Sequence, residues 1–292
     1  MRDWLLAGGL ALLLTACAAP RAAPDSADTQ GSIAVEPVVA LLVGQYAGLS
    51  WLDGEPGAPV QLSVERESNV PGGAILQMRQ TDAAGLERRF RISLAATSLA
   101  TRLNGSFEPL GADGQPSGQC ALEWIVRPRG VLARTEASSC RFGSGDGALG
   151  LIKEIAHDGE RLVIADRVVA AGTDRAVQLD RMLEVARVRA FRAWAGSRDG
   201  DAEPWRMASD FELRSDGGLV RPRDSAGMPL GMELDLALHR IAPQGPTVLR
   251  LRAFDIDSGA LLGQAWADPG AVRIGLALPQ LQVGLERPES AR

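Results

Sequence analysis

Apolar and polar residues alternate in short segments along most of this 292-residue chain. Each segment places its apolar side chains on one face, which is the period of a half-buried β-strand. The clearest sets are Val60, Leu62 and Val64; Phe90, Ile92 and Leu94; Leu162 and Ile164; Met232, Leu234, Leu236 and Leu238; and Val272, Ile274, Leu276 and Leu278. Turn-forming stretches rich in glycine and proline separate them, as at 54–59, 70–73, 111–118, 143–147 and 257–260. The pattern predicts a mostly β protein with antiparallel strands, because parallel strands would need helical crossovers, and it leaves a barrel and a sandwich both open.

Helical periodicity is scarce in comparison. Residues 37–43 predict a short helix. A weaker candidate covers residues 174–185, although Val177, Met182 and Leu183 fit a strand equally well. We therefore expect helix to contribute little to the fold.

The first residues form an apolar run of a different kind. Trp4 to Leu14 are too few to cross a bilayer, which needs about 20 residues, so the run is a targeting segment. It ends in Leu14-Thr15-Ala16-Cys17, the pattern of a bacterial lipobox. We expect a signal peptide at 1–16, lipidation of Cys17 and, because Ala18 and not aspartate follows, an outer-membrane anchor that faces the periplasm. An ordinary secretory signal cut elsewhere is the alternative.

Composition suggests how the rest of the chain is divided. Residues 17–36 are rich in alanine, proline, serine and aspartate, which predicts a flexible tether. The polar stretch 197–204 has the composition of a linker. We expect a β-barrel at 37–196 and a C-terminal β-rich domain or extension at 205–286. No second apolar segment approaches transmembrane length, so the expected contact with the membrane is the lipid alone.

Charge and residue counts exclude several functions. The net charge of −5 is opposite to that of most nucleic-acid binders. Two histidines and three cysteines, one of them expected to carry lipid, leave no plausible zinc or iron site. The sequence predicts no metal and no nucleic-acid partner.

Cys120 and Cys140 remain as a pair. Cys120, Leu122, Trp124 and Val126 alternate with other residues in a predicted strand; a turn at 128–130 and a second strand at 131–140 follow. The cysteines would lie at the open end of this hairpin, and in an oxidising periplasm they are expected to form a disulfide. A reactive thiol is the alternative.

A series of local motifs occurs between Leu41 and Trp194. They are Leu41–Tyr46, Ile75–Gln80, Glu87–Arg91, Gly118–Cys120 with Ser139–Cys140, Lys153–Ile155, Asp166–Val168 and Arg189–Arg192. Their order resembles the CpeT/CpcT family of phycobiliprotein chromophore lyases. The resemblance implies a calycin-like antiparallel β-barrel and, as a possible ligand, a tetrapyrrole such as a bilin. The chain departs from the family pattern at Gly48–Trp51 and at Val168, so the resemblance leaves open whether it is an enzyme.

The candidate site residues are polar or aromatic side chains on predicted strands. Arg89 and Arg91 share a strand face and suit a bidentate grip on a carboxylate. They form one candidate group, for which a solvated strand face is the alternative. Gln77, on the strand that resembles the glutamine-bearing strand of the family, is a further candidate. Asp166 and Arg167 are a second candidate group, with a structural ion pair as the alternative. Trp51 and Trp124 suit a flat apolar ligand, although an aromatic residue on an alternating strand is more often core.

No other motif in the sequence indicates a catalytic or metal site. Ser144 lacks the surroundings of a nucleophile elbow, and the Asp255–Gly259 segment lacks the later acidic ligand of a calcium loop. Gln264, Trp266, Asp268 and Arg273 form a polar-aromatic cluster that suits either a binding surface or an ordinary strand rim. No catalytic residue can be assigned. The sequence thus favours an envelope lipoprotein that binds a small apolar ligand or a protein partner, with a bilin-lyase-like enzyme and a purely structural envelope protein as alternatives.

Overall fold

The computed structural model describes residues 27–99, 101–135, 139–143, 147–173, 175–178, 180–200, 202–241 and 245–288. The expected signal peptide and Cys17 lie outside these residues. The described elements are α1 (Ala27–Leu42), β1 (Gly44–Leu52), β2 (Glu55–Val70), β3 (Gly73–Asp82), β4 (Glu87–Ala96), β5 (Arg102–Leu110), β6 (Cys120–Arg127), β7 (Gly130–Arg134), β8 (Arg141–Phe142), β9 (Leu149–His157), β10 (Arg161–Ala170), β11 (Arg181–Arg187), β12 (Ala190–Ser197), β13 (Arg206–Arg214), β14 (Met232–Arg240), β15 (Thr247–Asp255), β16 (Leu261–Ala267), β17 (Arg273–Leu278) and β18 (Leu281–Glu286).

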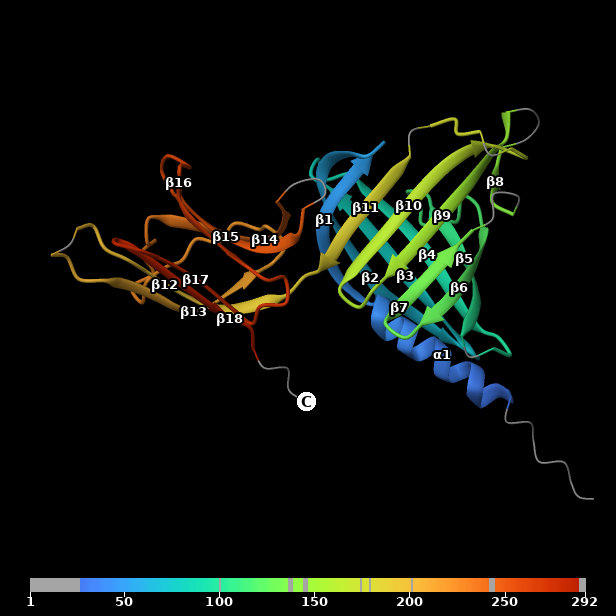
Figure 1. The fold of residues 1–292 in the computed structure, drawn as a ribbon, viewed down its shortest axis with the longest axis horizontal. Coiled ribbons are helices and arrows are strands. Elements are labelled where there is room, and N and C mark those ends of the chain that lie inside the picture. Colours follow the sequence, from blue (N-terminus) through green and yellow to red (C-terminus); the bar gives the residue numbers. More distant parts are fainter. Residues whose placement is uncertain are drawn as a thin grey trace, which may run out of the picture.

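Strands β1 to β7 and β9 to β11 form a closed antiparallel barrel (Figure 1). Each strand pairs with its neighbour along the chain, except that β7 pairs with β9. Pairing of β11 with both β1 and β10 closes the ring. The predicted mostly β fold with a calycin-like barrel is confirmed.

Helix α1 lies against one end of the barrel (Figure 1). Val35, Val38, Val39 and Leu42 are buried in the barrel core, at the spacing of one helical face. The helix begins at Ala27, ten residues before the expected start at Pro37, so residues 27–36 of the expected tether are helical. Pro37 lies inside the helix and did not mark its beginning.

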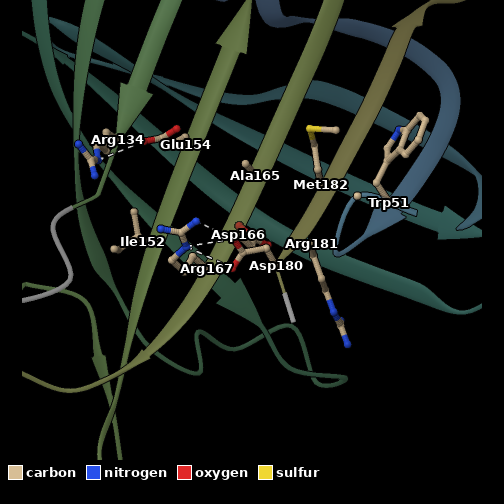
Figure 2. A pocket seen from close by; sticks show the side chains of 11 residues that line it. Trp51, Arg134, Ile152, Glu154, Ala165, Asp166, Arg167, Asp180, Arg181 and Met182 are labelled. Atoms are coloured by element: carbon tan, nitrogen blue, oxygen red, sulfur yellow. Dashed lines mark hydrogen bonds and ion pairs between the residues drawn. The ribbon is translucent and has the colours of Figure 1, made fainter. Parts of the chain in front are cut away.

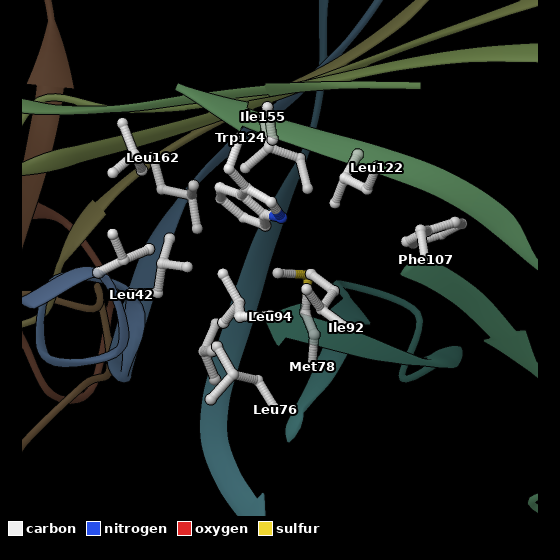
Figure 3. Packing of buried hydrophobic residues seen from close by; sticks show 14 of the residues in the cluster. Leu42, Leu76, Met78, Ile92, Leu94, Phe107, Leu122, Trp124, Ile155 and Leu162 are labelled. Atoms are coloured by element: carbon white, nitrogen blue, oxygen red, sulfur yellow. The ribbon is translucent and has the colours of Figure 1, made fainter. Parts of the chain in front are cut away.

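Large apolar side chains occupy the barrel interior (Figure 3). Every strand of the ring contributes at least one buried residue to this core, and Trp124 and Leu76 have 0% exposure. The opposite ends of strands such as β5, β7 and β10 lead into longer connections, at 110–120, 134–149 and 170–181. The barrel is therefore plugged by α1 at one end and bordered by loops at the other.

Two further sheets, ordered β13-β12-β18-β17 and β14-β15-β16, share a second core. They form the C-terminal β-rich region and confirm its existence. The boundary expected near residues 197–204 is displaced, because this polar stretch connects β12 to β13 within one hairpin. Phe191, which the expected barrel at 37–196 includes, is fully buried in the second core. The passage from barrel to sandwich is the short segment Val188–Arg189, between β11 and β12.

The structure corrects several local predictions about strand and helix bounds. The helical alternative for residues 174–185 is wrong where it overlaps β11, which begins at Arg181. The second strand of the Cys120 hairpin ends at Arg134, not at Cys140. Cys120 and Cys140 nevertheless form a buried disulfide with their Cα atoms 4.5 Å apart. Val272 lies before β17 and is exposed.

Candidate ligand-binding site

The two arginines of the first candidate group lie on the outer surface of the barrel. Alternation along β4 directs Phe90 and Ile92 to the core and Arg89 and Arg91 away from it. Arg91 donates two hydrogen bonds of 3.0 Å to Glu67. The carboxylate of Glu67 therefore occupies the bidentate position that was expected for the carboxylate of a ligand.

The remaining contacts of this group are also with the protein itself. Arg89 donates to the carbonyl oxygen of Ala112 at 2.9 Å and approaches Glu87 at 3.5 Å. Gln77 lies opposite Arg91 on β3, in the same outward row. The alternative of a solvated strand face therefore describes the two arginines, which lie three strands away from Trp51 on β1.

Asp166 and Arg167 are consecutive on β10 and pair with different residues. Asp166 forms an ion pair with Lys153, whereas Arg167 donates to Asp180 at 2.7 Å. The hydrogen bonds from Arg167 lower the pKa of Asp180 below its usual value. The two residues are thus not an ion pair with each other.

Trp51, Asp166 and Arg167 line one cleft of about 360 Å³ on the side of the barrel (Figure 2). Its apolar lining comes from β1, β9, β10 and β11 and consists of Trp51, Ile152, Ala165 and Met182. A volume of this size lies in the range of small-molecule sites, roughly 300–1,000 Å³. The structure therefore brings together half of the six predicted ligand-binding residues.

Most charged residues around this cleft are already paired. Arg134 lies 3.2 Å from Glu154, and Arg167 pairs with Asp180 (Figure 2). Arg181 forms no ion pair within the described residues, but the three arginines and three carboxylates that line the cleft have opposite charges, so the rim offers little net charge to a ligand. The cleft suits an uncharged molecule better than an acid.

Trp51 supplies a polar group inside this apolar lining. Its side chain is 8% exposed, and its Nε1 is buried without a hydrogen-bond partner. Figure 2 shows the indole nitrogen on the side of the ring nearer Met182. A buried N–H without a partner is costly, and an acceptor atom on a ligand would remove that cost.

Comparison of the chain with models of protein families, with curated proteins and with solved structures gives no match. The case for a site therefore depends on the geometry alone. No helix among the described residues is long and apolar enough to span a membrane. Within the same residues, no cluster of three or more His, Cys, Asp or Glu side chains is placed to hold a metal.

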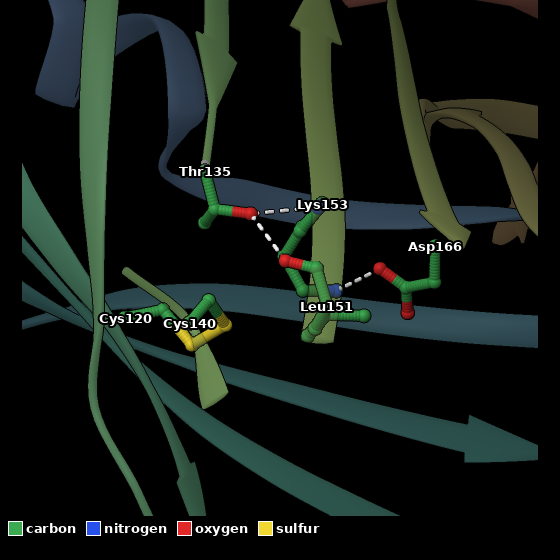
Figure 4. Close-up of a disulfide and its surroundings, with 6 residues drawn as sticks. All are labelled: Cys120, Thr135, Cys140, Leu151, Lys153 and Asp166. Atoms are coloured by element: carbon green, nitrogen blue, oxygen red, sulfur yellow. Dashed lines mark hydrogen bonds and ion pairs between the residues drawn. A yellow bond between two sulfur atoms is a disulfide. The ribbon is translucent and has the colours of Figure 1, made fainter. Parts of the chain in front are cut away.

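Lys153 is a feature that the search for site residues missed. It is the only lysine of the chain, and it is 3% exposed. Its Nζ pairs with Asp166 and lies 4.3 Å from the centroid of the Phe107 ring, and its backbone N–H donates to Thr135 at 2.8 Å (Figure 4). The signal in the sequence was its place between Leu151 and Ile155, in the alternating series that faces the core.

Proposed function

We propose that this chain binds a small, largely apolar and uncharged molecule, and that the ligand occupies the cleft beside Trp51. The observation that carries the proposal is the buried indole N–H of Trp51, which lacks a partner beside the apolar part of the lining. A small rotation of the indole would bring this N–H to the cleft, where a carbonyl or ether oxygen on the ligand would accept the hydrogen bond, and the apolar body of the ligand would cover Ala165 and Met182. The proposal includes no catalytic step.

The barrel interior is a weaker candidate for the same role. A ligand there would have to displace packed side chains such as Trp124, Leu94 and Leu122, each at most 2% exposed. Interiors of this density tolerate added volume poorly. The outer cleft requires no such displacement.

We further propose that the protein acts at the cell envelope as a lipoprotein, anchored to the outer membrane through Cys17 and facing the periplasm. The lipobox supports this proposal, and a buried disulfide suits an oxidising compartment. Metabolic labelling with palmitate and membrane fractionation test it. Cys17→Ser should abolish the label and release the protein from the membrane fraction; a labelled Cys17→Ser protein would contradict it.

The binding proposal is tested with prodan, an uncharged naphthalene ketone whose fluorescence shifts to the blue in apolar surroundings. Ala165→Phe should fill the cleft and weaken binding at least tenfold. The matched control is Ala121→Phe, an outward position on β6 away from the cleft, which should bind like the wild type. Trp51→Phe keeps a ring but removes the N–H, and should weaken binding about three- to tenfold.

Two results would overturn the proposal. The first is a wild-type protein that produces no blue shift. The second is an Ala165→Phe variant that binds as tightly as Ala121→Phe, which would place the probe elsewhere.

A purely structural role is the second candidate, and the packed barrel interior favours it. It predicts that neither prodan nor other small molecules bind. The lyase-like alternative is tested by adding bilins or haem and following their absorbance. A changed spectrum that Ala165→Phe abolishes would identify a tetrapyrrole as the ligand of the same cleft.

A further inference from the structure

The outer face of the β14-β15-β16 sheet carries a charged and an aromatic side chain on neighbouring strands. Strand register places Ala237, Arg250 and Trp266 side by side on β14, β15 and β16. Leu249 and Leu251 point into the sandwich core, so alternation directs Arg250 to the opposite face. On β14, Ala237 presents only a methyl group opposite Arg250, and the larger neighbour on that strand is His239.

Arg250 has no carboxylate partner among the described residues, unlike its neighbour Arg252, which pairs with Asp235. Asp235, the nearest acidic residue in the register, accepts hydrogen bonds of 3.0 and 3.1 Å from Nε of Arg252. Nε of Arg250 is buried and makes no hydrogen bond, and no ion pair joins Arg250 to any residue that the structure describes. Within the described residues, Asp235 therefore acts on Arg250 only as a nearby charge and not as an ion-pair partner.

An exposed aromatic ring lies beside this cation. Trp266 is 44% exposed, its ring lies 5.6 Å from the guanidinium carbon of Arg250, and its centroid is 5.5 Å from that of His239. The exposed indole offers a flat apolar surface that neither neighbour covers completely.

Two side chains of this face have lowered pKa values. Burial and, to a smaller degree, the neighbouring Arg252 lower the pKa of Arg250, whereas the charge of Asp235 opposes this shift. Burial, with Arg250 and Arg252, also lowers the pKa of His239. The two arginines thus disfavour a further positive charge on the neighbouring histidine.

We propose that this face binds a ring that bears a carboxylate, with the carboxylate on Arg250 and the ring stacked on Trp266. The charge-assisted hydrogen bond would satisfy the unpartnered guanidinium, and stacking would cover the exposed indole. Two sources share this chemistry, an acidic sugar and an aromatic acid. The site is independent of the cleft beside Trp51, because it lies in the other core unit and requires charge.

The sequence pointed to part of this face. Of the polar-aromatic cluster at 264–273, Trp266 and Gln264 lie on β16, where Gln264 is opposite Arg252. Asp268 accepts the backbone N–H of Gly270 at 2.7 Å in the following turn, and Arg273 pairs with Glu286 on the other sheet. The residue that completes the site, Arg250, was absent from the predicted cluster.

Nuclear magnetic resonance titration of the full chain tests the proposal through the indole N–H signal of Trp266, assigned with Trp266→Phe. The probes are naphthoate and trigalacturonate, each compared with its uncharged counterpart, naphthamide or the methyl ester. We expect at least one acid to shift the signal and its counterpart to bind at least tenfold more weakly. Naphthoate alone would identify an aromatic acid, and trigalacturonate alone an acidic sugar. No shift with either acid, or equal shifts with the uncharged probes, would overturn the proposal.

Arg250→Met supplies the decisive variant, and Arg273→Met is its control with the same change in net charge. Arg250→Met should lose at least tenfold in affinity, whereas Arg273→Met should bind like the wild type. Because Arg250 has no partner, Arg250→Met should melt no lower than Arg273→Met. Equal losses of affinity in the two variants would show a general charge effect and contradict the site. If Arg250→Met does not fold, added salt must weaken binding to wild-type protein; affinity that is independent of salt would also overturn the proposal.

Discussion

Tyr46, the only tyrosine of the chain, anchors the end of α1 to the barrel. Its side chain is 1% exposed, and its hydroxyl donates to the carbonyl oxygen of Leu42 at 2.7 Å. With its proton so used, the hydroxyl accepts from Arg187 and from Nε2 of His157, both at 3.2 Å. Nδ1 of His157 accepts the backbone N–H of Gly159 at 2.9 Å, so this network suits a neutral imidazole.

The first prediction concerns the ionisation of Tyr46. Burial raises the pKa of its hydroxyl from 10.0 to about 12, although the Arg187 charge opposes the shift. Ultraviolet titration of tyrosinate should therefore give a midpoint well above 10, and the single tyrosine makes the assignment unambiguous. Tyr46→Phe is the control without a signal, and a midpoint near 10 in folded protein would contradict the buried network.

The second prediction concerns His157 and acid stability. Burial, with the Arg187 charge, lowers the pKa of the imidazole below 6.5 in the folded protein. The unfolded chain takes up a proton at about pH 6.5, so the stability that comes from the neutral side chain is complete above this pH. It is lost as the pH falls toward the lower folded pKa.

Urea unfolding as a function of pH measures this effect. His157→Gln keeps a donor for Tyr46 but cannot titrate, so its free energy of unfolding should change less between pH 7 and pH 5 than that of the wild type. His239 also has a lowered pKa and is present in both proteins, so the difference between the two slopes isolates His157. Identical slopes would show that His157 is not kept neutral.

At the scale of single residues, alternation predicted which side chains face the core but not which polar groups meet. Alternation places Arg91 on the outer face of its strand. Its partner Glu67 lies beside a register irregularity in β2, which alternation does not reveal. Lys153 and Asp166 are adjacent because β9 and β10 pair in one register. Such pairings depend on strand register, which a sequence pattern specifies only through the buried face.

At the scale of elements, the strands were largely predictable and the helix was partly so. The spacing of Val35, Val38, Val39 and Leu42 carries the helical period, although their neighbours Gly31 and Pro37 have low helix propensity. The disulfide could be expected from the count of cysteines alone. Its position could not, because β7 ends at Arg134 and Cys140 lies outside that strand.

The third prediction concerns that disulfide. It closes a segment with a sequence separation of 20 and ties the 134–149 connection to the start of β6. The chain-entropy model assigns a loop of this size about 3 kcal/mol of stability. Cys120→Ser and Cys140→Ser should therefore each lower the free energy of unfolding by a similar amount, as measured by urea titration.

The double variant Cys120→Ala/Cys140→Ala is the control, because it avoids a free thiol and a buried hydroxyl. Two free thiols in the native protein would show that the bond does not form.

At the scale of the whole molecule, the chain forms two separate hydrophobic cores joined by polar contacts. Arg240 pairs with Glu184, Arg189 pairs with Glu160, and Arg214 donates to Gln45 across the junction. The presence of a second β-rich region was predictable from its alternating strands. Its boundary was not, because a polar hairpin turn has the composition of a linker, whereas the real junction between β11 and β12 is too short to show one.

The fourth prediction follows from the two cores. Leu251 is fully buried in the sandwich, so Leu251→Ala should destabilise that unit by about 2–5 kcal/mol. Because the contacts across the junction are polar and few among the described residues, the barrel should lose much less stability. Hydrogen exchange followed by mass spectrometry should show faster exchange in peptides from 190–286 and nearly unchanged exchange in peptides from 44–187. Leu94→Ala, at an equally buried position in the barrel core, should give the reverse pattern. If either variant accelerates exchange equally in both regions, the two cores unfold as one cooperative unit, and the polar junction transmits far more stability than its contacts imply.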